Sequence, residues 1–263
     1  MYGDGKTADN PKDAGALSGS VMKNAKAMEA RFNAAREQLA RQASVNPQRI
    51  GAVGYCFGGA VVLNMARAGA DLAAVAGFHA SLGLNTPAPR PGTVKAKILI
   101  LNGADDPFVK REQYDALKKD FDAAKADYRI IEYPGAVHAF TNPEATELGK
   151  KFNLPLRYDA KADQEAKAEA AKFFAANLQK YAKGYPAVAL CAGFASELVG
   201  CRFALALCGR RDGERKSASG PLTDRISWLC QRSLLATTRP QGIRSRISLR
   251  SILRAHHSHT QVS

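Results

Sequence analysis

The chain has 263 residues, 46% of them hydrophobic, which suits one large globular domain or two small ones. Its net charge of +14 is uneven, because residues 183–263 hold 13 of the 38 basic residues but only 4 of the 24 acidic ones. The charge therefore says little about the ligand of the first 182 residues. No apolar run reaches the roughly 18–20 residues of a membrane span, and no apolar signal core follows Met1. We therefore expect a cytoplasmic protein with no membrane partner.

Short apolar strands and amphipathic helices alternate along the first 182 residues. Residues 1–15 are rich in Gly, Asp, Asn and Pro and predict a loop, whereas apolar side chains in residues 16–42 have helical spacing. Four strands are then predicted, the first beginning at Ile50 and the others at residues 73–78, 98–101 and 128–133. Further helices are predicted at residues 58–67, 112–126 and 163–181. A polar segment with Pro143 and Pro155 precedes the last helix, and the alternation predicts an α/β fold with a mostly parallel sheet of about four strands.

A cysteine stands where the first strand gives way to a helix. Cys56 has Gly54 two residues before it and Gly58 two residues after it, followed by Gly59. This is the spacing of the G-x-S-x-G nucleophile elbow with cysteine for serine, although a buried cysteine in a glycine-rich turn is the alternative. Glycine suits the elbow because a side chain two residues from the nucleophile would clash in so sharp a turn. The N-terminus of the next helix favours a thiolate, and the Phe57 N–H can donate to an oxyanion.

Acidic and basic side chains follow two later strands. Chemistry in parallel α/β sheets collects beyond the carboxyl ends of the strands, and α/β-hydrolases carry nucleophile, acid and histidine in that order. Asp105 and Asp106 follow the third strand, and the pattern Gly-x-x-Asp-Pro-x-Val favours Asp106 as the one that orients a histidine. His138 follows the fourth strand and suits a general base or the imidazolium partner of a thiolate. The alternative for His138 is a surface or core histidine in a loop.

Two other side chains near these positions are assigned to the surroundings of the site. His79 ends the second strand, too early in the chain for the base in this order, so we expect it to pack in the core or to line the substrate pocket. Tyr55, directly before the cysteine, is assigned to the same pocket. The four cysteines beyond residue 183 lack C-x-x-C spacing and lie far from the late histidines, so no metal site is expected.

Several segments carry recognisable patterns in a fixed order. They read Gly-Tyr-Cys-Phe-Gly-Gly at residues 54–59, Phe-His at 78–79, Asn-Gly-Ala-Asp-Asp-Pro-Phe-Val at 102–109 and Tyr-Pro-Gly-Ala-Val-His-Ala-Phe-Thr-Asn-Pro at 133–143. Together they resemble the dienelactone hydrolase family of α/β-hydrolases. The resemblance covers residues 1–182 and implies a triad of Cys56, His138 and Asp106. It also implies a hydrolase of small esters or enol-lactones, similar to a carboxymethylenebutenolidase, that needs no cofactor.

Three parts of the family's pattern find no match in this chain. Family members carry about four more strands before the position of Met1, a loop with a second oxyanion donor, and a glutamate that interacts with the resting cysteine. We therefore interpret residues 1–182 as the C-terminal part of such a hydrolase domain. The alternative is a truncated, catalytically incompetent fragment, in which the strand opening at Arg49 lies near a sheet margin with unpaired backbone groups.

Residues 183–263 match nothing in the family and are expected to be a basic, poorly ordered or unstructured extension. Of their 13 basic residues, 11 are arginine, so a nucleic-acid-binding segment is an alternative. The segment has few aromatic residues among its basic ones and no regular basic spacing, so this alternative is not favoured. Nucleic acid is not the expected partner. The expected partner is a small ester or lactone substrate, and no oligomeric state is predicted.

Overall fold

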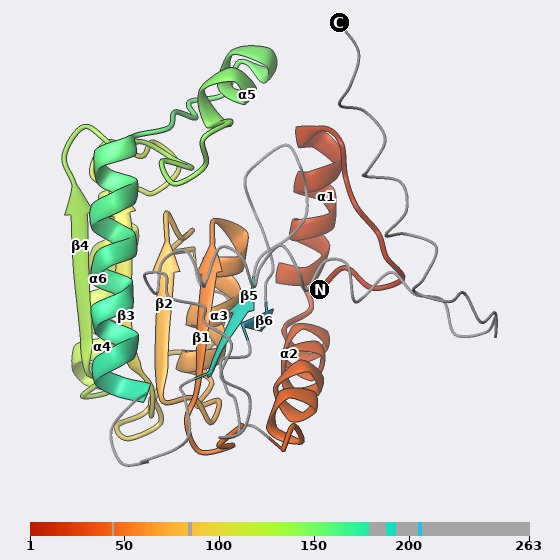
Figure 1. Cartoon of the computed structure of the whole chain (residues 1–263), viewed down its shortest axis with the longest axis vertical. Helices are drawn as coiled ribbons and strands as arrows, with labels where there is room; N and C mark the ends of the chain where they lie inside the picture. The colour runs from red at the N-terminus through yellow and green to blue at the C-terminus, as the bar shows by residue number, and fades with distance from the viewer. Residues whose placement is uncertain (44, 84–85, 179–187, 193–204, 207–263) are drawn as a thin grey trace, which may run out of the picture.

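The chain folds around one sheet, and the computed structural model describes residues 1–43, 45–83, 86–178, 188–192 and 205–206. Within these residues the sheet has six strands in the order β4-β3-β2-β1-β5-β6 (Figure 1). The strands are β1 (Ile50–Tyr55), β2 (Ala74–Phe78), β3 (Lys97–Gly103), β4 (Tyr128–Tyr133), β5 (Val188–Ala192) and β6 (Leu205–Ala206). Strands β1 to β5 are parallel and β6 is antiparallel to β5. The predicted α/β fold, with four parallel strands from the first 182 residues, is confirmed.

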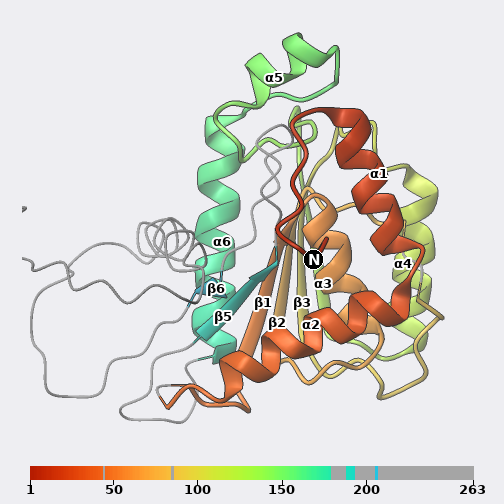
Figure 2. The ribbon, with the colours of Figure 1, turned by 90° about the vertical axis from the view of Figure 1, so that its right-hand side faces the viewer.

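Helices cover both faces of the sheet, as a parallel sheet requires. On one face lie α1 (Pro11–Met22), α2 (Ala25–Ala40), α3 (Phe57–Arg67) and α4 (Arg111–Ala123). The other face is covered by α6 (Ala160–Leu178), as Figure 2 shows. The short α5 (Ala145–Phe152) projects beyond the end of the sheet to which the β4 arrow points (Figure 1). None of the helices in the described part of the chain is long and apolar enough to cross a membrane.

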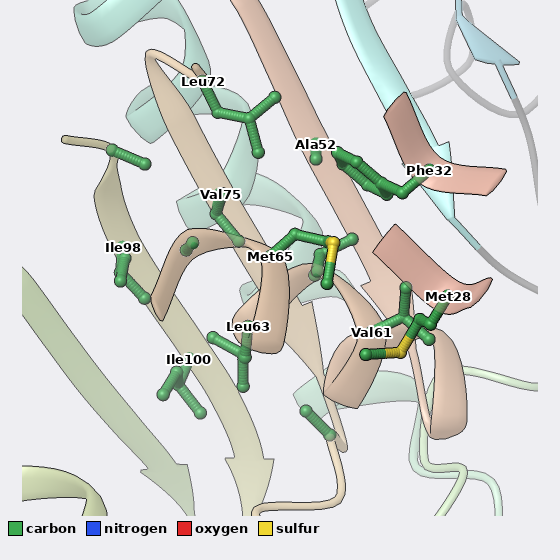
Figure 3. Close-up of a cluster of buried hydrophobic side chains, with 14 of the residues drawn as sticks. Met28, Phe32, Ala52, Val61, Leu63, Met65, Leu72, Val75, Ile98 and Ile100 are labelled. Atoms are coloured by element: carbon green, nitrogen blue, oxygen red, sulfur yellow. The ribbon is translucent and has the colours of Figure 1, made fainter. Parts of the chain in front are cut away.

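The hydrophobic core has two layers, one on each face of the sheet. Successive side chains of a strand point to opposite faces, so neighbours in one strand enter different layers. Ala52 faces α2 and α3, where Phe32 and Met65 are fully buried with it (Figure 3). Its neighbour Val53 faces α6 and packs with Phe174. The strands are thus packed on both faces, and backbone pairing fixes the register of β1 to β4.

The N-terminal helix expected at residues 16–42 is two helices. Asn24 separates them, and its side-chain oxygen accepts a hydrogen bond from the Ala27 N–H at 3.0 Å, which caps the start of α2. The first helix also begins earlier than expected, at Pro11, where Asn10 caps it in the same way. The predicted apolar face is confirmed in α2, where Met28, Phe32 and Leu39 are buried.

One helix in the polar segment between His138 and α6 was not predicted. The segment contains α5, eight residues long, with Gly149 in its interior. A Cβ at Gly149 would lie 2.5 Å from the Leu156 carbonyl oxygen, so tertiary packing requires glycine where helix propensity disfavours it. Because the helix is short and contains that glycine, it has no clear helical pattern of apolar residues in the sequence.

The expectation that β1 lies at a sheet margin is wrong. Strand β5 pairs with the edge of β1 in parallel, with Ile50 opposite Val188 and Gly54 opposite Ala192. This pairing satisfies backbone groups that an open edge would expose. Strands β5 and β6 are short described segments of the region in which no regular structure was expected. The rest of residues 183–263, and with it the nucleic-acid interpretation, lies outside the described residues.

Candidate active site

Cys56 stands in a sharp turn between β1 and α3. Its backbone has φ 52° and ψ −119°, a conformation that non-glycine residues rarely adopt and that is often found at functional sites. Gly54 is required beside it, because a Cβ there would lie 2.1 Å from the Gly58 carbonyl oxygen. Gly59 is required as well, because its Cβ would lie 2.5 Å from that of Ala80. The steric reason predicted for the glycine two residues before the cysteine is therefore confirmed.

The structure brings the cysteine, the histidine and one aspartate into a continuous line of contacts. His138 Nε2 lies 3.0 Å from Cys56 Sγ, and His138 Nδ1 lies 2.7 Å from Asp106 Oδ2. The other carboxylate oxygen of Asp106 accepts a hydrogen bond from the Phe108 N–H at 2.9 Å. Asp105 is exposed and does not take part in this line. These three side chains follow β1, β3 and β4, so the parallel sheet delivers them to one edge.

Burial and charge act in opposite directions on His138. Its side chain is only 3% exposed, and burial by itself lowers the pKa of the imidazole. The negative charge of Cys56 and the hydrogen bonds with Asp106 and Cys56 outweigh burial and raise the pKa of His138 to about 10. An imidazolium beside a thiolate is the form that this environment favours, and the thiolate is the reactive form of cysteine.

His79 is buried directly beside His138. It is fully covered, has a backbone φ of 34°, and its Nε2 lies 2.9 Å from Thr141 Oγ1. Its ring makes an edge contact with that of His138, with the centroids 5.2 Å apart. The pKa of His79 is lowered well below 6.5, mainly by burial and secondly by the charge of His138. Of the two expectations for His79, these contacts match packing, and the packing is against the histidine of the site.

The other two predicted site residues lie on either side of Cys56. Phe57 is the first residue of α3, so its N–H is among the N-terminal groups of that helix, and its ring stacks on Tyr2 at 6.1 Å between centroids. Tyr55 is half-buried at the end of β1 and stacks on Phe78 at 4.7 Å. Tyr55 also lies beside His79, with the ring centroids 5.8 Å apart.

Two residues in contact with the site were not singled out from the sequence. Thr141 holds the ring of His79, as described above. Phe108 is 46% exposed and makes an edge contact with the ring of His138, with the centroids 5.1 Å apart. Their position just after Asp106 and His138 is the signal that could have indicated them. Among the described residues, no group of three or more His, Cys, Asp or Glu side chains is placed to hold a metal ion.

This arrangement has the parts that acyl transfer needs. A thiolate can attack a carbonyl carbon, an imidazolium can donate a proton to a leaving group, and a buried carboxylate can orient the imidazole. The helix α3 begins at Phe57, directly after the cysteine, and N–H groups at such a helix start can stabilise an oxyanion. A parallel sheet with a cysteine in a strand-to-helix turn, and an aspartate and a histidine after later strands, is the arrangement of an α/β-hydrolase.

Comparison with known proteins identifies the family. The model of the dienelactone hydrolase family matches residues 1–178, and the chain belongs to this family of hydrolases. An uncharacterized protein, K02A2.1, from Caenorhabditis elegans is 29% identical over 140 residues, which are 53% of this chain and 87% of that protein. A putative carboxymethylenebutenolidase from Synechocystis is 26% identical over an alignment of 107 residues, and the match covers 37% of this chain and 42% of that protein.

Solved structures agree with this assignment. The structure named m3DLH has a TM-score of 0.62 and 29% identity, and the match covers 68% of this chain and 72% of that one. A dienelactone hydrolase-like promiscuous phosphotriesterase from metagenomic libraries has a TM-score of 0.58 and 30% identity, over 67% of this chain and 72% of that one. In both comparisons the sequence identity is high enough to indicate a family relationship in addition to a shared fold.

Proposed function

We propose that this chain hydrolyses carboxylic esters or lactones with a triad of Cys56, His138 and Asp106. One observation carries the proposal, namely the line of contacts from Sγ to Nε2 at 3.0 Å and from Nδ1 to Oδ2 at 2.7 Å. Both distances lie within hydrogen-bond reach, as nucleophilic catalysis with an oriented base requires. The strained backbone of Cys56 is a second, independent support.

In the first step, the Cys56 thiolate attacks the carbonyl carbon of the substrate. A carbon–sulfur bond forms, and the carbonyl oxygen becomes an oxyanion that the Phe57 N–H stabilises by donating a hydrogen bond. The oxyanion then collapses, and the bond between the carbonyl carbon and the leaving oxygen breaks. His138 gives its Nε2 proton to the leaving oxygen, so an alcohol departs, or a lactone ring opens, and a thioester remains on Cys56.

In the second step, water hydrolyses the thioester. Neutral His138 takes a proton from the water, and the resulting hydroxide attacks the thioester carbon. The carbon–sulfur bond breaks, the carboxylic acid is released, and Cys56 returns to a thiolate beside a protonated His138. Asp106 keeps the imidazole in one orientation and stabilises its charge in both steps.

The relatives support this choice of substrate class. The Synechocystis relative is named a putative carboxymethylenebutenolidase, and the family is named for dienelactones. We therefore propose that the substrate of this chain is a small-molecule ester or lactone and that the reaction needs no cofactor. The close line of contacts favours this function over the alternative of an inactive fragment. A cytoplasmic location stays a prediction.

Hydrolysis of p-nitrophenyl acetate and of a dienelactone tests the proposal. We expect the purified chain to turn over both compounds, and Cys56→Ala to abolish turnover while its thermal melt stays cooperative. Cys230→Ser is the control for general thiol chemistry and keeps full activity. Wild-type protein that melts cooperatively but hydrolyses neither compound contradicts the proposal, as does equal activity in Cys56→Ala.

A further inference from the structure

Phe108 is the large hydrophobic side chain that the described part of the chain leaves exposed. It is 46% exposed, whereas the phenylalanines of the core are buried. Leaving an aromatic ring in water forgoes the free energy of burial. Single exposed apolar residues are common on protein surfaces, so exposure alone indicates nothing. The position of this ring, against the histidine of the site, is what gives it meaning.

The backbone that carries the ring is held at a defined place, although the ring itself is partly open to solvent. Its own backbone N–H donates to Asp106 Oδ1 at 2.9 Å, and the next N–H, that of Val109, donates to the Asp106 carbonyl oxygen at 3.2 Å. Val109 is buried in the core. The ring plane lies at 83° to that of His138. Phe108 is therefore fastened to the same carboxylate that orients His138.

The chemistry of the proposed reaction places the leaving group beside His138. His138 must give its proton to the leaving oxygen, so that oxygen comes within hydrogen-bond reach of Nε2. The carbonyl oxygen must instead approach the Phe57 N–H at the start of α3. The alcohol portion of the substrate then lies beside His138, where Phe108 is its exposed apolar neighbour. The acyl portion lies on the side of α3.

We propose that Phe108 is a specificity-determining residue that forms an apolar wall for the alcohol portion of the substrate. The site then prefers esters whose alcohol portion is aromatic or otherwise apolar, and this preference does not depend on the acyl group. The inference rests on the proposed function, because it uses the direction of proton transfer from His138. Covering about 50 Å² of ring surface corresponds to roughly a tenfold effect on kcat/KM.

Two substrate series separate the alcohol portion from the acyl portion. Phenyl acetate and methyl acetate share the acetyl group and pass through the same acetyl-enzyme, so they differ only in acylation. p-Nitrophenyl acetate and p-nitrophenyl butyrate share the alcohol portion. The variants are Phe108→Ala, Phe108→Leu, which keeps apolar volume, and the control Phe173→Ala, which removes a partly exposed ring on α6.

Phe108→Ala is expected to lower kcat/KM for phenyl acetate about tenfold and to change that for methyl acetate less than twofold. Phe108→Leu is expected to lie between Phe108→Ala and the wild type. The ratio of butyrate to acetate activity stays constant in every variant, and Phe173→Ala behaves as the wild type. Equal losses on phenyl and methyl acetate, or a shift in the butyrate-to-acetate ratio, overturn the assignment of Phe108 to the alcohol side.

A binding measurement separates failure of this inference from failure of the proposed function. Phenol, the product from the alcohol portion, is expected to slow alkylation of Cys56 by iodoacetamide in the wild type and in Phe173→Ala, but not in Phe108→Ala. This readout needs no ester hydrolysis. If the protein hydrolyses no ester but phenol protects Cys56 only when Phe108 is present, the proposed function is rejected and the apolar contact of Phe108 is kept. Phenol protection that is equal in Phe108→Ala and the wild type rejects the role of Phe108.

Discussion

The ring of His79 meets the ring of His138 at 65°, with their centroids 5.2 Å apart, and the two histidines favour opposite charge states. The pKa of His79 is lowered well below 6.5 by burial and by the charge of His138. The pKa of His138 is raised to about 10, because the charge of Cys56 and the hydrogen bonds outweigh burial. A neutral ring therefore packs against a charged one, and His79 supports His138 without competing for its charge.

Exchange of His79 tests whether its packing or its polar atoms matter. His79→Phe keeps a ring against His138 but leaves the Thr141 hydroxyl, now 2.9 Å from Nε2, without that partner. We expect the variant to lose about 1–3 kcal/mol of unfolding free energy in urea titrations, because a buried polar group is left unsatisfied. Adding Thr141→Val to His79→Phe is expected to restore part of this loss. Losses that simply add in the double variant would contradict a shared interaction.

The pH dependence of Cys56 alkylation tests the ion pair. With the pKa of His138 raised to about 10, the charged imidazole and the stability it contributes are fully present below pH 6.5 and are lost as the pH rises through about 10. Iodoacetamide is therefore expected to modify Cys56 readily at pH 6. In His138→Ala the rate at pH 6 is expected to fall roughly 10–100-fold, because an uncharged neighbour no longer favours the thiolate.

Glutathione, whose thiol is unperturbed, is the reference for that experiment. Its alkylation rises steeply with pH between 6 and 9, whereas that of the wild-type Cys56 is expected to change little over the same range. A Cys56 rate that follows the glutathione curve would show that no ion pair forms in the resting protein. Peptide mapping by mass spectrometry assigns the modified cysteine.

Asp106→Asn tests the orientation of the imidazole. The amide nitrogen of the new side chain would face His138 Nδ1 at the position of Oδ2. Neutral His138 would then carry its proton on Nε2, so Nε2 could no longer accept a proton. We expect kcat/KM for p-nitrophenyl acetate to fall by roughly 10²–10⁴. The matched control is the exposed neighbour, Asp105→Asn, which is expected to stay within about twofold of the wild type. Similar losses in the two variants would count against the role of Asp106.

Gly54→Ala tests the steric requirement of the elbow. The added methyl group would lie 2.1 Å from the Gly58 carbonyl oxygen and 2.6 Å from the Gly59 nitrogen, so backbone must move. We expect the free energy of unfolding, measured in urea, to fall by about 3 kcal/mol or more, which is among the larger effects of single substitutions. Gly19→Ala in α1 meets nothing within 4 Å and is expected to gain about 0.5–1 kcal/mol. An unchanged melt in Gly54→Ala would refute the tight turn.

The alternation of strands and helices and the turn around Cys56 could be predicted because their signals are local or topological. The glycines around Cys56 are required by contacts within a few residues, such as that between Gly54 and Gly58. Asp106 and His138 meet because carboxyl ends of parallel strands share one edge of a sheet. The helix break at Asn24 is also local, and the capping residue was its signal. The apolar spacing on both sides concealed it.

Other elements could not be predicted because contacts distant in sequence decide them. Gly149 disfavours a helix locally, yet α5 includes it because the chain must pass close to the Leu156 carbonyl. The partner of β1 on its second edge is β5, more than 130 residues away along the chain by the pairing of Ile50 with Val188. No pattern within either strand indicates that pairing.

The sequence by itself determined the fold class, the glycine-rich turn around Cys56 and which residue types follow each strand. Only the tertiary structure decided that His79 lies against His138 and that Phe108 stays exposed beside it. The physical reason is that residue spacing specifies where a side chain leaves the backbone, whereas its direction depends on the backbone angles of turns and on neighbours from other strands. The φ of 34° at His79 is such an angle, held between β2 and the next loop by packing that no local pattern records.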